Sequence, residues 1–309
     1  MSVPRIYAVG ETVFDIIFKN YQPQAAKPGG SAFNAMISLG RLGIPGEFIS
    51  EVGNDRIGNY IKHFLSENGV GNEYVIMFED GKSALSLAFL NEALDAEYDF
   101  YKDYPKQRLN KEIPTFTESD YLLFGSFYGL NLSLRPQIKS MLSAANANNS
   151  LVYYDPNFRS THLDDLEQLI DIIEENFSAS TLIRASDEDM RNIYGVNDFE
   201  AASKKILSFC DYFVYTANSH GIYLATPKFQ LHVKVDHIEP VSTIGAGDTF
   251  NAGILYGFYK LGVTGKTISD LTEHKWKEIL QTAALFSKEV CLSYDNYIPS
   301  KFADKFINS

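Results

Sequence analysis

Short apolar runs and helix-patterned segments alternate along most of the chain, and this alternation constrains the fold more than any other feature. Residues 6–9 form a short apolar run that ends at Gly10, as a buried strand would. Residues 31–42 then repeat apolar side chains at three- and four-residue spacing, which predicts a helix. The same succession resumes at residues 121–124 and 134–146. The pattern predicts an α/β fold, a three-layer sandwich with a largely parallel central sheet.

The alternation is interrupted in the first third of the chain. Residues 83–90 and 97–101 are typical of two strands joined by a polar turn. Together with an earlier β-rich run, they predict a small β lid that is discontinuous in sequence, at about residues 12–28 and 83–103. We expect one domain, residues 1–309, to carry this lid.

The composition excludes several classes of protein. The formal net charge is -12, whereas binding to nucleic acid or to an anionic membrane requires clustered positive charge. Cys210 and Cys291 are the two cysteines, and we expect buried thiols in a reducing compartment rather than a disulfide. No uninterrupted apolar run reaches the roughly 20 residues of a membrane span. We therefore expect a cytoplasmic protein with no nucleic-acid or membrane partner.

A glycine turn in the last third of the chain has the properties of a phosphate site. Gly245, Ala246 and Gly247 precede a helical pattern, and such small residues let backbone N–H groups face a ligand at a helix start. These groups could stabilise charge during phosphoryl transfer. Asp248 at the same helix start could accept a proton from a hydroxyl, but it could equally be an N-cap. This short segment alone does not decide between the two roles.

A second glycine turn opens the helix predicted near the N-terminus. Gly29 and Gly30 allow a ligand to approach the backbone closely, and Asn34 offers both donors and acceptors. Asp15 adds a carboxylate from an upstream strand. A carboxylate and an amide together can hold vicinal hydroxyls of a polyol. An ordinary turn with a capping side chain is the alternative, and the segment alone favours it.

Together, the two glycine segments resemble the paired signatures of the ribokinase-like (PfkB) family of carbohydrate kinases. The first signature is GGSAFNAMISLGRLG at residues 29–43, and the second is STIGAGDTFNAG at residues 242–253. Intervening pieces match in order, so the resemblance extends from about residue 6 to residue 299. It implies a ribokinase-like fold and an ATP-dependent kinase that transfers the γ-phosphate to a sugar hydroxyl.

The resemblance also implies a role for each matching residue. Asp248 would be the catalytic base, and the amides of Gly245, Ala246 and Gly247 would stabilise the transferring phosphoryl group. ATP and Mg²⁺ are the implied cofactors, with Asp189 at the position associated with the metal. The sugar would be held by Asp15, Gly29, Gly30, Asn34 and Arg159. The nucleotide would be contacted by Asn157, Ser186, Thr216, Asn218 and Gly221.

Several positions depart from the family pattern. Asp189 replaces a glutamate and is one methylene shorter, so its ligation of magnesium is left open. Ser242 replaces an aspartate that commonly helps to build a monovalent-cation site, so potassium activation is also left open. Asn218 lies in a turn that is usually richer in glycine, and asparagine can adopt the left-handed conformation required there. His220 in the same turn is interpreted as a loop residue, not a catalyst.

The substrate is the least constrained feature. The Tyr-Asp-Phe-Tyr segment at residues 98–101 is one of several that resemble fructokinase-type members most. A 2-keto-3-deoxygluconate kinase, a ribokinase and a nucleoside kinase share the scaffold. A non-catalytic sugar- or nucleotide-binding regulator is an alternative that retention of Asp248 disfavours. A dehydrogenase would need Gly-x-Gly-x-x-Gly after the first strand, where Gly10-Glu11-Thr12 stands instead. We expect a homodimer, which would cover the exposed edge of the lid.

Overall fold

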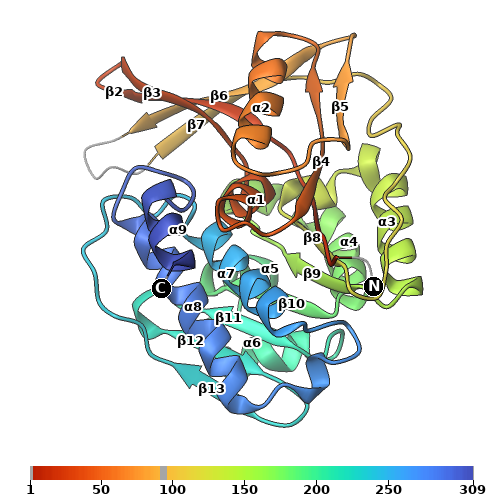
Figure 1. Ribbon diagram of the computed structural model, residues 1–309, viewed down its shortest axis with the longest axis vertical. Coiled ribbons are helices and arrows are strands. Elements are labelled where there is room, and N and C mark those ends of the chain that lie inside the picture. Colours follow the sequence, from red (N-terminus) through yellow and green to blue (C-terminus); the bar gives the residue numbers. More distant parts are fainter. Residues whose placement is uncertain (1–2, 91–95, 309) are drawn as a thin grey trace.

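A large, nine-stranded sheet forms the centre of the molecule. The computed structural model describes residues 3–90 and 96–308, and its strand order is β13-β12-β11-β10-β9-β8-β1-β4-β5 (Figure 1). All neighbours from β5 to β11 pair in parallel, whereas β12 and β13 form an antiparallel edge. The strands are β1 (Ile6–Val9), β4 (Gly46–Gly53), β5 (Val75–Phe78), β8 (Tyr121–Gly125), β9 (Leu151–Asp155), β10 (Leu182–Ser186), β11 (Phe213–Thr216), β12 (Ile222–Ala225) and β13 (Gln230–Val233).

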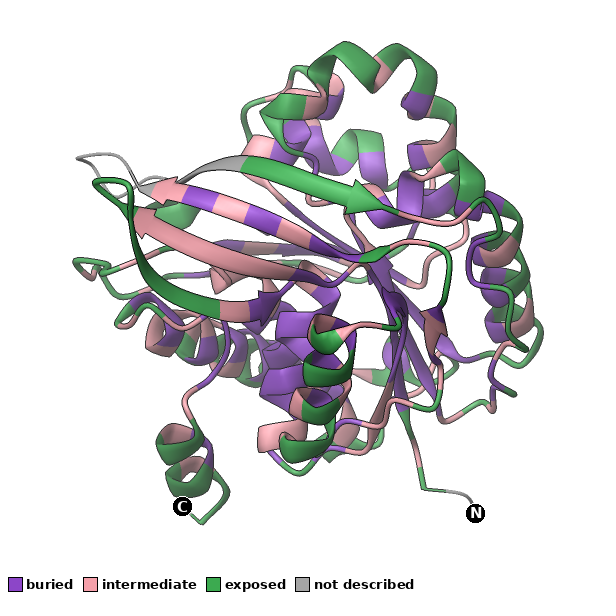
Figure 2. Cartoon of the chain, turned by 90° about the horizontal axis from the view of Figure 1, so that it is seen from above, coloured by how far each residue is buried: buried purple, intermediate pink, exposed green. Residues whose placement is uncertain are grey.

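Helices cover both faces of this sheet and make the three layers that the sequence predicts. The core divides into two apolar clusters, one on each face. The first face is covered by α1 (Ser31–Arg41), α2 (Arg56–Glu67), α7 (Ala246–Leu261), α8 (Glu273–Cys291) and α9 (Ser300–Ile307). The second is covered by α3 (Arg135–Ala147), α4 (Leu166–Ser178), α5 (Asp187–Tyr194) and α6 (Phe199–Ile206). Buried residues accordingly concentrate in the central strands and on the helix faces turned toward them (Figure 2).

A separate, four-stranded sheet lies at the upper left of Figure 1 and is called the small sheet below. Its order is β3-β2-β6-β7, with β2 parallel to β6 and the other pairs antiparallel. The strands are β2 (Val13–Lys19), β3 (Gln22–Gly29), β6 (Lys82–Leu90) and β7 (Ala96–Asp103). They occupy nearly the segments in which the lid is predicted, and most of the predicted turn at residues 91–96 lies outside the described residues.

The cysteines, the helix lengths and the boundaries of two elements complete the description of the fold. Both cysteines are buried and free, as expected, and burial raises the pKa of Cys210 to about 12. No described helix has the length and apolar character needed to span a membrane. A short 3-10 helix (Ser160–Asp165) precedes α4. Strand β13 is not anticipated from the sequence. It has only four residues, too few for their alternation of polar and apolar side chains to indicate a strand.

Candidate active site

The glycine turn before α7 has a backbone that requires glycine. Gly245 is the N-cap of α7 with a left-handed φ of 78°. A Cβ atom there would collide with the backbone oxygen of Asn296. No side chain among the described residues caps this helix start. The Ala246 N–H donates to the backbone oxygen of Thr243 at 3.3 Å, whereas the N–H groups of Gly247 and Asp248 have no acceptor among the described residues and are available to an anion.

Asp248 in the first turn of α7 does not cap its own helix. Its carboxylate accepts hydrogen bonds from Ser31 Oγ at 2.7 Å and from Asn34 Nδ2 at 2.8 Å. Both donors lie on α1, which packs alongside α7 (Figure 1). Asp248 therefore does not act as an N-cap, and the helix start after Gly30 likewise has no side-chain cap among the described residues. Burial raises the pKa of Asp248, while the two hydrogen bonds oppose this rise.

The start of α1 is also shaped by glycine. Gly30 is its N-cap with φ 131°, and a Cβ atom there would collide with the backbone oxygen of Glu11. Asn34 is 4% exposed, and its Oδ1 accepts no hydrogen bond from the described residues. An unpaired buried acceptor is costly, so this oxygen is suited to a hydroxyl donor supplied by a ligand.

Asp15 projects from β2 of the small sheet. Its Oδ1 accepts a hydrogen bond from Ser86 Oγ at 2.5 Å, and Lys27 is its direct partner on β3. Burial raises the pKa of Asp15 to about 6, and the contacts with Ser86 and Lys27 limit the rise. A Cβ atom on Gly29 would collide with the Asp15 carboxylate, which explains the glycine at that position.

Arg184 is a component of the site that sequence reasoning missed. This β10 side chain is 8% exposed and donates to Asp155 Oδ2 at 3.0 Å and to Thr216 Oγ1 at 2.6 Å. A Cβ atom on Gly247 would lie only 3.1 Å from Arg184 Nη1. The guanidinium therefore packs closely against the glycine turn. Asn251 of α7 also donates to Asp155 Oδ2, at 2.6 Å. A charged residue within an apolar strand pattern was the available signal.

Asp189 has its carboxylate oxygens engaged by the protein. It forms a reciprocal capping box with Ser186 at the start of α5. Its Oδ1 accepts from the Phe158 backbone at 2.6 Å, and its Oδ2 accepts from the Ser186 backbone at 2.7 Å. Burial raises the pKa of Asp189, and the neighbouring Asp155 raises it further. Among the residues that the structure describes, no group of three or more His, Cys, Asp or Glu could hold a metal ion.

The segment after β9 brings two more predicted residues to the same edge of the sheet. Asn157 has a positive φ of 39° and donates from Nδ2 to Ser126 Oγ at 2.9 Å. The Arg159 side chain is 63% exposed and lies 3.8 Å from the Glu188 carboxylate. Its positive charge also partly opposes the rise that burial causes in the pKa of Asp248. An exposed guanidinium in this position can reach an anionic ligand.

The predicted nucleotide turn follows β11. Asn218 adopts φ 45°, which confirms that asparagine supplies the left-handed conformation. Gly221 has φ 103°, and a Cβ atom there would lie 2.6 Å from the backbone oxygen of Val233. His220 contributes its backbone oxygen, which is 2.9 Å from His232 Nε2. His220 itself is exposed, which fits its interpretation as a loop residue.

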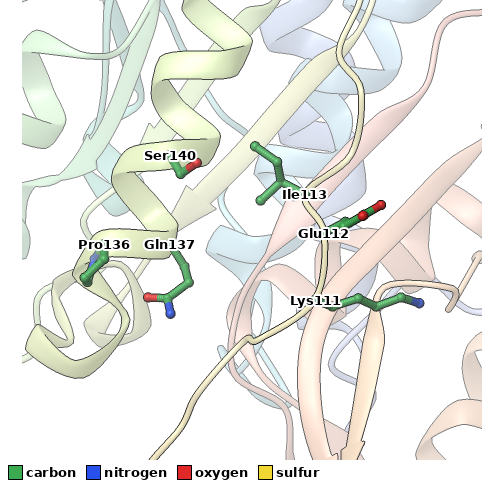
Figure 3. Close-up of a pocket in the computed structure, with 6 residues that line it drawn as sticks. All are labelled: Lys111, Glu112, Ile113, Pro136, Gln137 and Ser140. Carbon is green, nitrogen blue, oxygen red and sulfur yellow. The ribbon is translucent and has the colours of Figure 1, made fainter.

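A separate hollow of about 570 Å³ lies between the segment after β7 and α3 (Figure 3). None of the predicted site residues lines it, so it is not part of the candidate active site. It is lined by Lys111, Glu112, Ile113, Pro136, Gln137 and Ser140.

The arrangement thus combines a free helix start, a desolvated carboxylate and an unpaired amide oxygen. The sequence model of one protein family, described as "pfkB family carbohydrate kinase", matches residues 4–301. The chain belongs to this family. As a pfkB-family kinase it is a phosphotransferase that acts on a sugar hydroxyl.

Three relatives of this pfkB-family kinase illustrate the range of names in the family. The probable fructokinase-5 of Arabidopsis thaliana is 25% identical over 315 residues, covering 97% of this chain and 94% of that protein. The fructokinase of Klebsiella pneumoniae is 24% identical over 267 residues, or 84% and 86% of the two chains. The aminoimidazole riboside kinase of Salmonella typhimurium is 23% identical over 263 residues, or 82% and 81%.

Solved structures show the same fold. The aminoimidazole riboside kinase of Salmonella enterica, complexed with aminoimidazole riboside and an ATP analogue, superimposes with a TM-score of 0.83. The identity is 18%, and the alignment covers 98% of this chain and 99% of that chain. A fructokinase double mutant of Vibrio cholerae O395, bound to fructose, ADP and a potassium ion, gives a TM-score of 0.83 at 20% identity, covering 99% of both chains.

Proposed function

We propose that this pfkB-family kinase transfers the γ-phosphate of ATP to fructose or a closely similar sugar, with Asp248 as the catalytic base. One observation carries this proposal. The Asp248 carboxylate joins the two glycine turns, because it lies in the first turn of α7 and accepts hydrogen bonds from Ser31 and Asn34 of α1. The sugar end and the phosphate end of the site therefore meet at one desolvated acid.

In this mechanism, Asp248 accepts the proton of the attacking hydroxyl. Burial raises its pKa, which makes it a stronger base than a carboxylate in water. Asp15 and the free Oδ1 of Asn34 accept hydrogen bonds from sugar hydroxyls, while Gly29 and Gly30 allow the sugar to approach the backbone. Arg159 contacts the substrate or the transferring phosphate.

At the phosphate end, backbone N–H groups at residues 245–247 receive the transferring phosphoryl group, and the Ala246 N–H exchanges its present acceptor, the Thr243 backbone oxygen, for the phosphate. Arg184 packs close to Gly247 and the Asn296 backbone packs close to Gly245, and we expect this packing to limit the reorganisation of the turn as charge develops. The nucleotide lies against the turns at the ends of β9, β10 and β11. The residues proposed to contact it are Asn157, Ser186, Thr216, Asn218 and Gly221.

Magnesium enters this scheme as part of the ATP substrate. Mg²⁺ commonly keeps several waters and binds through one or two carboxylates plus substrate phosphates. Asp189 does not fit as a direct ligand, because it is only 4% exposed and its two oxygens accept hydrogen bonds from the backbone of Phe158 and of Ser186. We assign Asp189 instead to holding Ser186 and the backbone of Phe158 in place.

We further propose that the chain is one domain, in which the small sheet serves as a lid over the sugar and the kinase is a cytoplasmic homodimer. The position of Asp15 on the small sheet supports the lid, because a ligand bound to that carboxylate would touch both sheets. The free, buried cysteines support a reducing compartment. The mostly half-buried strand β2 supports a partner that covers the small sheet.

A riboside is a second candidate substrate, which the similarity to aminoimidazole riboside kinases favours. ADP release should therefore be measured with Mg²⁺ and ATP against fructose, ribose, 2-keto-3-deoxygluconate, tagatose 6-phosphate, adenosine, inosine and aminoimidazole riboside. Each assay is run with and without potassium, because Ser242 leaves potassium activation open. We expect the highest kcat/KM for fructose. A markedly higher kcat/KM for a riboside would replace fructose as the substrate.

Asp248→Asn tests the assignment of the base. We expect its kcat to fall by about two to four orders of magnitude, the usual contribution of a general base. The exposed Asp304→Asn is the matched control and should retain wild-type turnover. Near-normal turnover by Asp248→Asn would refute its role as the base, and ligand binding without turnover by the wild type would indicate a non-catalytic regulator.

A further inference from the structure

Lys27 makes contacts in two directions. It is the register partner of Asp15 across β2 and β3, and its positive charge lowers the pKa of Asp15. Its ammonium group also donates a hydrogen bond to the backbone oxygen of Tyr294 and lies 3.7 Å from Asp295 Oδ1. The Lys27 side chain is 14% exposed and that of Asp295 is 50% exposed, so the lysine is largely shielded from water while its ion pair with Asp295 is only partly shielded. Lys27 therefore connects the small sheet to the loop between α8 and α9 (Figure 1).

That loop contacts both glycine turns through a single buried residue. Asn296 is 4% exposed. Its Nδ2 would lie 3.5 Å from a Cβ atom on Gly29, and its backbone oxygen lies against Gly245. A displacement of residues 294–296 would therefore change the packing behind the sugar turn and behind the phosphate turn at once.

We propose that Lys27 is a positioning residue that couples sugar binding at Asp15 to the geometry of the phosphate turn, through residues 294–296. The inference rests on the proposed function, which assigns Asp15 to the sugar and the turn at Gly245 to the phosphate. A sugar that binds Asp15 changes the hydrogen bonding of the carboxylate that faces Lys27, and Lys27 transmits the change to Tyr294 and Asp295. Because coupling between two binding sites is reciprocal, ATP binding would strengthen sugar binding by the same factor.

The coupling is measured by calorimetry of the full-length protein. The dissociation constant of the non-hydrolysable analogue AMP-PNP, with Mg²⁺, is determined with and without saturating fructose. For the wild type we expect fructose to tighten AMP-PNP binding on the order of tenfold, within the usual range of allosteric coupling. For Lys27→Met we expect the factor to fall below about twofold, and for Lys27→Arg to recover, since arginine retains the charge and the donors.

Two further lysines of the small sheet provide controls. Lys19 is exposed at the end of β2, and Lys19→Met should leave the coupling factor unchanged. Lys102 pairs with Glu11 at 2.7 Å, whereas Lys27 pairs with the loop at residues 294–296. Lys102→Met should weaken fructose binding by loosening β7 but keep the coupling factor. Thermal unfolding of each variant verifies that it is folded.

The outcomes separate this inference from the proposed function. Wild-type turnover of fructose without any coupling would overturn the inference alone, and so would a normal coupling factor in folded Lys27→Met. Equal loss of coupling in Lys102→Met and Lys27→Met would also overturn it, because general loosening of the small sheet would then be the cause. Wild-type protein that neither binds nor phosphorylates fructose would overturn the fructokinase proposal and the inference with it.

Discussion

At the scale of single residues, Asp15 combines a proposed ligand contact with an energetic cost. Burial raises its pKa to about 6, and hydrogen bonding and the charge of Lys27 limit the rise. The ionised carboxylate is the stronger hydrogen-bond acceptor, and protonation converts one of its oxygens into a donor. We therefore expect the affinity for fructose to fall as the pH drops below about 6. Calorimetric measurement of the fructose dissociation constant from pH 5 to pH 8 would test this, and a flat profile would contradict it.

The same raised pKa makes Asp15 a source of instability. The folded state binds the proton more tightly than the unfolded state, so the free energy of unfolding decreases as the pH rises from about 4 to about 6 and stays lowered above. Asp15→Asn removes the buried charge. We expect this variant to unfold at a temperature a few degrees above that of the wild type at pH 8, with little difference at pH 4. Loss of fructose turnover in the same variant would show that Asp15 serves binding at the expense of stability.

Residues differ in how far their roles could be predicted from the sequence. Asn34 and Asp248 could be proposed from the sequence because they lie beside glycine turns, and Asp15 could be proposed as a carboxylate on a strand upstream of one of them. Ser31 and Arg184 could not be, because their contacts join segments that are distant in sequence. Arg184 lies in a strand pattern and meets Asp155 and Thr216 only when three neighbouring strands align.

At the scale of elements, α7 offers a matched pair of glycines. Gly245 and Gly262 both have left-handed φ angles, 78° at its start and 62° at its end. A Cβ atom on Gly262 meets nothing within 4 Å, whereas one on Gly245 collides with the backbone of Asn296. An alanine at position 262 would therefore introduce backbone strain alone, and an alanine at position 245 would introduce backbone strain and a steric clash.

We expect Gly262→Ala to cost about 1–2 kcal/mol of stability, the strain of the left-handed conformation alone, and to leave turnover unchanged. Gly245→Ala should cost more stability, because the collision adds to the strain, and should lower kcat strongly because it displaces the phosphate turn. Urea unfolding and ADP release would measure the two effects. Equal behaviour of the two variants would contradict the special role of the turn at Gly245.

Helices and strands could be predicted from the sequence where burial leaves a clear apolar pattern. Strands such as β9 are buried along their whole length and read as apolar runs. By contrast, β13 is a short edge strand with two exposed residues, and β3 is largely exposed, so their strand character depends on pairing with neighbours. The contact between Asn296 and Gly245 is likewise set by tertiary packing, which no local pattern specifies.

At the scale of the whole molecule, the small sheet has two unlike faces. Side chains alternate along a strand, so Asp15 and Ser86 share one face and their neighbours Ile16 and Leu87 share the other. Farther along this second face, Phe18 and Phe89 stack with ring centroids 5.0 Å apart. These apolar side chains are only half-buried. An apolar sheet face of this kind favours association with a second copy, which is why we propose a homodimer.

Leu87→Asp tests this association directly. A carboxylate in the centre of the second face would have to be desolvated in the dimer, so we expect the variant to be monomeric by light scattering at concentrations where the wild type is dimeric. Leu132 is 64% exposed on the large part of the molecule, and Leu132→Asp is the matched control that should remain dimeric. If the small sheet acts as a lid supported by its partner, the monomeric variant should also show a raised KM for fructose, since its lid is no longer held by a second copy. A wild-type mass that stays monomeric at every concentration would reject the dimer, and a dimeric Leu87→Asp would place the interface elsewhere.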